Sequence, residues 1–142
     1  MHSIEMEFNQ CNKPVILLAE DDPDQSDSLR ESLELEGFKV ETVFSGDMAL
    51  RKLTEHTYAA AIMDLRMPGL NGGTVLKVCR VKQNPIRIPI IIVSAFASPL
   101  ELKKYEECGA SASFSKPLDF QKLLARLNQL VPRENSAVLK PS

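Results

Sequence analysis

The chain of 142 residues has few cysteines, no tryptophan and no long apolar run. Its cysteines, Cys11, Cys79 and Cys108, are far apart. This argues against a disulfide framework and for a reducing, cytoplasmic location. No Cys or His pairs have the close spacing of zinc ligands. No apolar run approaches the roughly 20 residues that span a bilayer, and the N-terminus does not resemble a secretory signal, so no membrane association is expected.

An excess of charge of either sign is also missing. The 17 basic and 19 acidic residues give a net charge of −2, without the basic footprint of a protein that binds nucleic acid directly. The composition, 44% hydrophobic and 25% charged, is that of a soluble globular protein, and the length fits one domain.

Five short segments have the character of β-strands. Three are uninterrupted apolar runs, typical of strands covered on both faces: Val15–Ala19, Ala59–Met63 and Ile90–Val93. Lys39–Val43 alternates and Ala112–Ser115 is short and partly polar, so these two are expected at the edges of the sheet.

Helical patterns follow each strand, at Asp24–Glu36, Asp47–Glu55, Gly73–Lys82, Pro99–Cys108 and Asp119–Val131. The alternation predicts a single α/β domain over residues 14–131 with a parallel sheet. Right-handed crossovers and the predicted burial favour the strand order 2-1-3-4-5. Residues 1–13 are interpreted as an N-terminal tail and 132–142 as a C-terminal tail or the start of a linker.

Acidic residues stand where two of the central strands end. Glu20, Asp21 and Asp22 follow the first strand and Asp64 follows the third, at the point where the predicted strand order reverses. Ligands bind at such a point, beyond the carboxyl ends of the strands. Clustered carboxylates resist joint ionisation unless a cation lies among them, and Mg²⁺ suits such oxygen ligands.

Other polar groups are expected at the same rim. The backbone carbonyl of Arg66 could be a further ligand, Ser94 ends the fourth strand, and Lys116, followed by Pro117, ends the fifth. A hydroxyl and an ammonium group are the donor and the positive charge that an anionic phosphoryl group requires.

The segments ILLAEDD, AIMDLRMPGLNG, IIVSAFA and GASASFSKP, in this order, resemble the receiver (CheY-like) domain of two-component response regulators over about residues 14–131. The resemblance implies the (βα)5 flavodoxin-like fold. It implies that Asp64 accepts a phosphoryl group from a histidine kinase or histidine phosphotransfer protein in a Mg²⁺-dependent reaction. The protein would then be a signalling phosphoacceptor that catalyses only its own phosphorylation and dephosphorylation.

By the same resemblance, Mg²⁺ is held by Glu20, Asp21, Asp64 and the Arg66 carbonyl. Lys116 pairs with the phosphoryl oxygens, and its peptide bond to Pro117 is cis. Asp22 is then an extra acid, interpreted as a helix N-cap rather than a ligand.

The resemblance also implies a switch made by Ser94 and Phe114, which reshapes the face of the fourth helix, fifth strand and fifth helix for a downstream protein. Glu101, Lys104 and Tyr105 are the hypothetical partner surface on that face. A monomer or weak dimer is expected.

Three alternatives stay open: a receiver excised from a longer DNA-binding regulator, one from a hybrid histidine kinase, and an interaction module independent of phosphorylation. Dimerising DNA-binding members often have an Asp pair where this chain has Ala112 and Ser113, which disfavours that subfamily. An aspartyl phosphatase would need a second Asp at Arg66, and a flavin binder a glycine- and hydroxyl-rich first loop.

Overall fold

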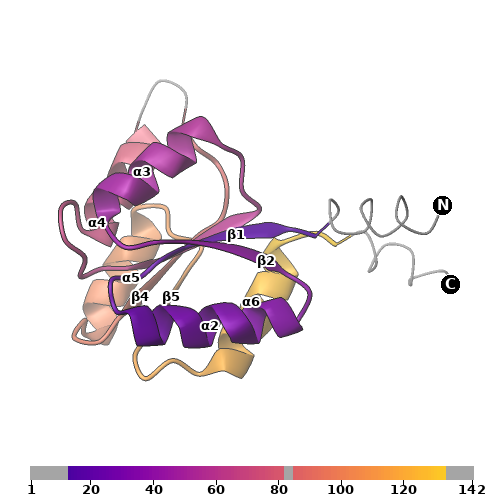
Figure 1. The fold of residues 1–142 in the computed structure, drawn as a ribbon. Helices are drawn as coiled ribbons and strands as arrows, with labels where there is room; N and C mark the ends of the chain where they lie inside the picture. The colour runs from indigo at the N-terminus through magenta and orange to yellow at the C-terminus, as the bar shows by residue number, and fades with distance from the viewer. Residues whose placement is uncertain (1–12, 82–84, 134–142) are drawn as a thin grey trace, which may run out of the picture.

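The computed structural model describes residues 13–81 and 85–133, so most of both predicted tails, and Lys82 at the predicted end of one helix, lie outside it. Five parallel strands form one sheet in the order β2-β1-β3-β4-β5, which confirms the predicted fold class (Figure 1). The strands are β1 (Val15–Ala19), β2 (Lys39–Val43), β3 (Ala60–Asp64), β4 (Ile90–Ser94) and β5 (Ala112–Ser115).

The third and fourth strands extend one residue beyond their predicted ends. Asp64 is the last residue of β3, where it pairs in register with Val93 of β4, and Ser94 is the last residue of β4. Pairing between strands far apart in the sequence fixes these ends, which local residue patterns do not reveal.

Helices follow every strand and begin near their predicted starts. They are α2 (Pro23–Leu35), α3 (Gly46–Glu55), α4 (Gly72–Val81), α5 (Pro99–Glu107) and α6 (Phe120–Leu130). Side chains of Asp22, Ser45, Ser98 and Asp119 accept backbone N–H groups at the starts of α2, α3, α5 and α6. Such N-caps satisfy donors that the first helical turn leaves free. Gly37 follows α2 with a φ of +94°, which glycine adopts readily.

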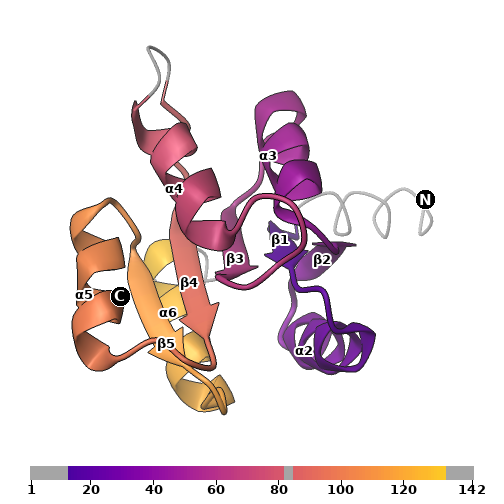
Figure 2. The same cartoon turned by 90° about the vertical axis from the view of Figure 1, so that its left-hand side faces the viewer.

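The core has two layers, one on each face of the sheet. Along β1, Ile16 and Leu18 join the cluster under α2 and α6, whereas Leu17 and Ala19 join the cluster under α3 and α4. Successive side chains of a strand point to opposite faces, so an uninterrupted apolar run is what a strand covered on both sides requires. Figure 2 shows these helices on the two sides of the sheet.

Within the described residues, no helix combines the length and apolar character needed to cross a membrane.

Two leucines on α2 test this layering. Leu33 is completely buried in the core, whereas Leu35 is 86% exposed. Leu33→Ala should lower the free energy of unfolding by about 3 kcal/mol, because it removes buried methyl groups and leaves a cavity. Leu35→Ala should change it by less than about 0.5 kcal/mol. Urea denaturation measures both, and equal effects would contradict the packing of α2.

Candidate functional site

Acidic side chains from two strand ends meet at one edge of the sheet. Glu20 directly follows β1 and Asp64 ends β3, and these strands are neighbours in the sheet. Together with Asp21 they place carboxylate oxygens within 4.8 Å of one another. Glu20 and Asp64 are only 6% and 7% exposed, whereas Asp21 is exposed. The strand order thus creates the acidic cluster that the sequence predicts.

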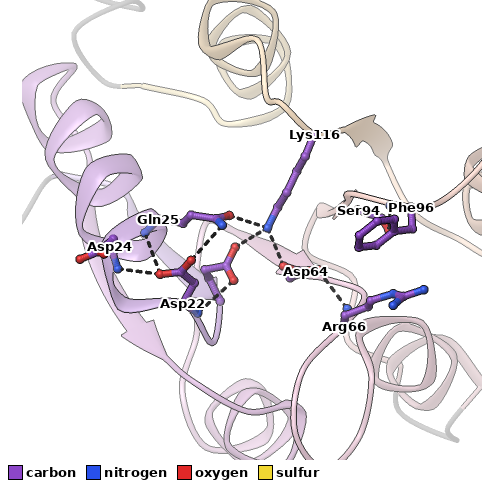
Figure 3. A network of polar contacts seen from close by, with 9 residues as sticks. Asp22, Asp24, Gln25, Asp64, Arg66, Ser94, Phe96 and Lys116 are labelled. Atoms are coloured by element: carbon purple, nitrogen blue, oxygen red, sulfur yellow. Dashed lines mark hydrogen bonds and ion pairs between the residues drawn. The ribbon is translucent and has the colours of Figure 1, made fainter.

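Lys116, just after β5, brings a positive charge into this cluster. Its Nζ donates to Glu20 Oε1 at 2.6 Å, to Asp64 Oδ2 at 2.7 Å and to Gln25 Oε1 at 2.7 Å (Figure 3). Its side chain is only 20% exposed. The ammonium group therefore joins the two buried carboxylates and reaches the first turn of α2. The Lys116–Pro117 peptide bond is cis.

Burial and charge shift the pKa values of this group in definite directions. Burial raises the pKa of Glu20 and the nearby Asp64 carboxylate adds to this, while hydrogen bonds from Lys116 and the backbone of Asp22 oppose it. Burial by itself would lower the pKa of Lys116, but its hydrogen bonds with Asp64 and Glu20 outweigh burial and raise it. The raised pKa keeps Lys116 protonated, so a positive charge lies directly beside Glu20.

The acidic cluster fits a hard cation. Glu20, Asp21 and Asp64 offer oxygen atoms only, in a group small enough to surround one ion. Hard cations such as Mg²⁺ and Ca²⁺ bind carboxylate oxygens, whereas softer metals prefer nitrogen or sulfur ligands. The cluster therefore suits Mg²⁺ or Ca²⁺.

Asp22, the third acid of the Glu-Asp-Asp segment, belongs to the helix rather than to the cluster. Its Oδ1 accepts N–H groups of Asp24 at 3.0 Å and Gln25 at 3.5 Å, so Asp22 is the N-cap of α2, as expected. Its own backbone N–H donates to Glu20 Oε2 at 3.2 Å. The start of α2 is thereby connected to the buried carboxylate.

The loop after β3 holds Asp64 in place. The backbone N–H of Arg66 donates to Asp64 Oδ1 at 3.0 Å, leaving Oδ2 to Lys116. Farther along, Gly72 N–H donates to Leu65 O at 3.1 Å. A Cβ at Gly72 would lie 2.5 Å from Asp64 O, so this close return of the chain requires glycine. The Arg66 side chain is exposed, and the guanidinium carbon lies 4.6 Å from the centre of the Phe96 ring.

Ser94 and Phe114 lie on adjacent strands. Ser94 is 2% exposed, and its Oγ accepts the backbone N–H of Phe96 at 3.3 Å. Phe114 is half-buried and packs against the core cluster under α2 and α6. Of the two residues predicted to form a switch, Ser94 ends the strand next to β3, whereas Phe114 lies one strand farther from Asp64.

The three residues predicted as a partner surface differ in their surroundings. Glu101 Oε1 accepts the backbone N–H of Ser98, forming a capping box at the start of α5. Tyr105 is half-buried and its ring occupies the space that a Cβ at Gly73 would need. Lys104 is exposed.

Gln25 contacts Lys116 directly and was not predicted from the sequence. The residue lies three positions after Asp22, one turn into α2, facing the strand ends. Only this position in the first turn of α2 could have indicated the contact with Lys116, because glutamine at such a position is not typical of any particular function.

Comparison with known proteins agrees with the fold. The sequence model of a protein family, the response regulator receiver domain, matches residues 16–128. The transcriptional regulatory protein PrrA of Mycobacterium tuberculosis is 34% identical over 129 residues, 91% of this chain and 54% of PrrA. A CpxR homolog of Haemophilus influenzae is 36% identical over 121 residues, 85% of this chain and 52% of the homolog. The chain thus spans about half the length of these curated relatives.

Solved structures give the same result. The receiver domain of the Francisella response regulator 1452 superposes with a TM-score of 0.78 and 31% identity, covering 83% of this chain and 96% of that one. The receiver domain of the sensor histidine kinase PA1611 from Pseudomonas aeruginosa, solved with a magnesium ion coordinated in its active site cleft, has a TM-score of 0.74 and 29% identity, covering 83% and 97%.

The match of the family model over most of the chain, the parallel sheet in the order 2-1-3-4-5 and the acidic cluster with its lysine lead to one conclusion: the chain belongs to the receiver domain family of two-component response regulators.

Proposed function

We propose that Asp64 accepts a phosphoryl group from the phosphohistidine of a histidine kinase or a histidine phosphotransfer protein. The observation that carries this proposal is the position of Lys116 Nζ, 2.7 Å from Asp64 Oδ2 and inside a cluster with Glu20 and Asp21. Asp64 thus lies beside an ammonium group and within a cluster that fits a cation. These two positive charges are what a phosphoryl group requires during transfer.

The reaction forms one bond and breaks one. An oxygen of the Asp64 carboxylate attacks phosphorus, an acyl phosphate forms, and the bond from phosphorus to the donor histidine nitrogen breaks, leaving the electron pair on that nitrogen. Lys116 then transfers its contact from Asp64 to a phosphoryl oxygen. Glu20, Asp21, Asp64 and the Arg66 carbonyl would hold Mg²⁺, which would supply positive charge to the oxygens around phosphorus.

Phosphorylation is proposed to act on the rest of the domain through Ser94 and Phe114. The Ser94 hydroxyl turns toward the new phosphoryl oxygens, and Phe114 leaves its half-buried position for the space beside it. The outer face formed by α5, β5 and α6 changes with Phe114, and a downstream protein reads the change there, at a surface including Glu101, Lys104 and Tyr105. Such a switch shifts populations of two pre-existing conformations.

The wider role is proposed on the basis of the family likeness. The domain over residues 14–131 acts in the cytoplasm as a signalling phosphoacceptor, as a monomer or weak dimer, and its only catalysis is its own phosphorylation and dephosphorylation. The matched region is about half the length of relatives named transcriptional regulators, which supports a receiver that works within a DNA-binding regulator.

The first prediction tests the phosphoacceptor. Incubation with acetyl phosphate and Mg²⁺ should add one phosphoryl group to the intact protein, and Asp64→Asn should gain none, because the amide lacks the nucleophilic oxygen. Intact-mass spectrometry measures the gain. Removing Mg²⁺ with a chelator should abolish it in the wild type.

Two results would contradict the proposal. Equal gain in Asp64→Asn would place the phosphoryl group elsewhere. No gain in the wild type, with either acetyl phosphate or a phosphorylated histidine phosphotransfer protein, would leave an interaction module that works without phosphorylation.

The second prediction concerns the stacked pair at the rim of the site. Arg66, in the loop that holds Asp64, lies over the Phe96 ring, and we propose that the pair restricts the path of water to the acyl phosphate. Arg66→Asn and Phe96→Ala should each shorten the phosphoryl half-life roughly 2- to 5-fold, the range that corresponds to one exposed cation–π contact. Loss of radiolabel over time measures the half-life.

A matched control for Arg66→Asn is Arg51→Asn, which removes an exposed arginine that pairs with Glu55 on α3. This variant should keep the wild-type half-life. Half-lives in Arg66→Asn and Phe96→Ala equal to that of Arg51→Asn would refute the shielding.

A further inference from the structure

Gln25 joins the start of α2 to the lysine of the site. Its Oε1 accepts a hydrogen bond from Lys116 Nζ at 2.7 Å, and its Nε2 donates to Asp22 Oδ2 at 3.0 Å. Figure 3 shows two consecutive contacts, from Asp22 to Gln25 and from Gln25 to the Lys116 ammonium group. Gln25 is thus the one neutral acceptor among the three that Lys116 contacts.

Asp22 fixes which way the carboxamide faces. Its Oδ1 is engaged by the backbone of α2, so its Oδ2 is held toward Gln25. A reversed carboxamide would point its oxygen at the Asp22 carboxylate and its N–H groups at the Lys116 ammonium. Both contacts would be repulsive, because carboxylate oxygens only accept and an ammonium group only donates. The helix cap therefore orients the glutamine oxygen toward Lys116.

The other two acceptors of Lys116 have competing duties in phosphoryl transfer. Glu20 and Asp64 belong to the acidic cluster, and Asp64 is the proposed nucleophile. When their oxygens turn to a cation or to phosphorus, Lys116 loses contacts on that side. Gln25 lies outside that cluster and can keep its contact throughout the reaction.

We propose that Gln25, oriented by Asp22, is a positioning residue that holds the Lys116 ammonium group over Asp64 during phosphoryl transfer. This inference rests on the proposed phosphoacceptor function. It also gives the extra acid of the Glu-Asp-Asp segment a role: Asp22 orients Gln25 in addition to capping α2.

The first test needs no reaction. In the metal-free protein, NMR measures how fast the Lys116 ammonium protons exchange with water. Gln25→Met removes the acceptor at nearly constant side-chain length and should speed the exchange roughly 5-fold, since one hydrogen bond to a charged, partly exposed group is lost. The control is Gln121→Met, at an exposed glutamine in the first turn of α6, also just after an aspartate N-cap. It should leave the exchange unchanged.

The second test measures the reaction and a stable mimic of its product. At saturating Mg²⁺, Gln25→Met should lower the rate of phosphorylation by acetyl phosphate roughly 5-fold and weaken the binding of beryllofluoride by a similar factor, because both depend on a correctly placed ammonium group. Gln121→Met should match the wild type in both measurements.

A rescue experiment separates positioning from a structural effect. Asp22→Asn keeps an oxygen for the cap but turns an N–H group toward Gln25, so it should slow phosphorylation about as much as Gln25→Met. Adding Gln25→Glu reverses donor and acceptor: Asn at position 22 then donates to Glu at position 25, whose other oxygen accepts from Lys116. This double variant has the wild-type net charge and should recover to within about 2-fold of the wild-type rate.

The outcomes are distinguishable. Exchange in Gln25→Met equal to the control, or faster exchange without slower phosphorylation, overturns the inference while the phosphoacceptor function stands. Failure of the double variant to recover relative to Asp22→Asn also overturns it. A wild type that gains no phosphoryl group refutes the proposed function and the inference with it, whatever the exchange measurement gives.

Discussion

The site depends on one constraint, the burial of two carboxylates side by side at the ends of neighbouring parallel strands. Glu20 and Asp64 are almost inaccessible to water, and two such charges would be costly without a cation among them. Lys116 supplies that charge through two short contacts. Four elements contribute to the balance: β1 and β3 bring the acids, β5 brings the lysine, and the start of α2 contacts Glu20 through the Asp22 N–H and Lys116 through Gln25.

The same balance suits the proposed phosphoryl transfer. The Lys116 side chain is still 20% exposed, so its ion pairs can exchange partners. Asp21, which is exposed, adds a third carboxylate to Glu20 and Asp64. In the proposed reaction, a cation brings positive charge to the carboxylates and the phosphoryl group brings negative charge to Lys116, so both sides of the ion pair keep a partner. Backbone contacts position Asp64: the N–H of Arg66 donates to one of its oxygens, and Gly72 lets the following loop return against the strand.

Much of this follows from the sequence, since uninterrupted apolar runs identify the central strands and the acids and lysine stand directly at strand ends. The rest depends on contacts between distant segments. Pairing with β4 makes Asp64 part of β3, and the stacking of Arg66 on Phe96 joins two loops. The contact between Gln25 and Lys116 can be predicted only when the orientation of α2 relative to β5 is known. Glu101 was predicted only as a surface residue, although Ser98 three residues earlier has the spacing of a capping box.

The central claim, that these carboxylates and Lys116 form one cation-dependent site, is tested most directly by titrating the ¹⁵N-labelled protein with Mg²⁺ and following backbone amides by NMR. The account predicts saturable binding of one ion, with the largest shifts at residues 20–22, 64–66 and 116. Asp21→Asn should weaken this binding, and Asp47→Asn, which changes an exposed acid at the start of α3, should not. Shifts that fail to saturate, or equal binding in Asp21→Asn and the wild type, would contradict it.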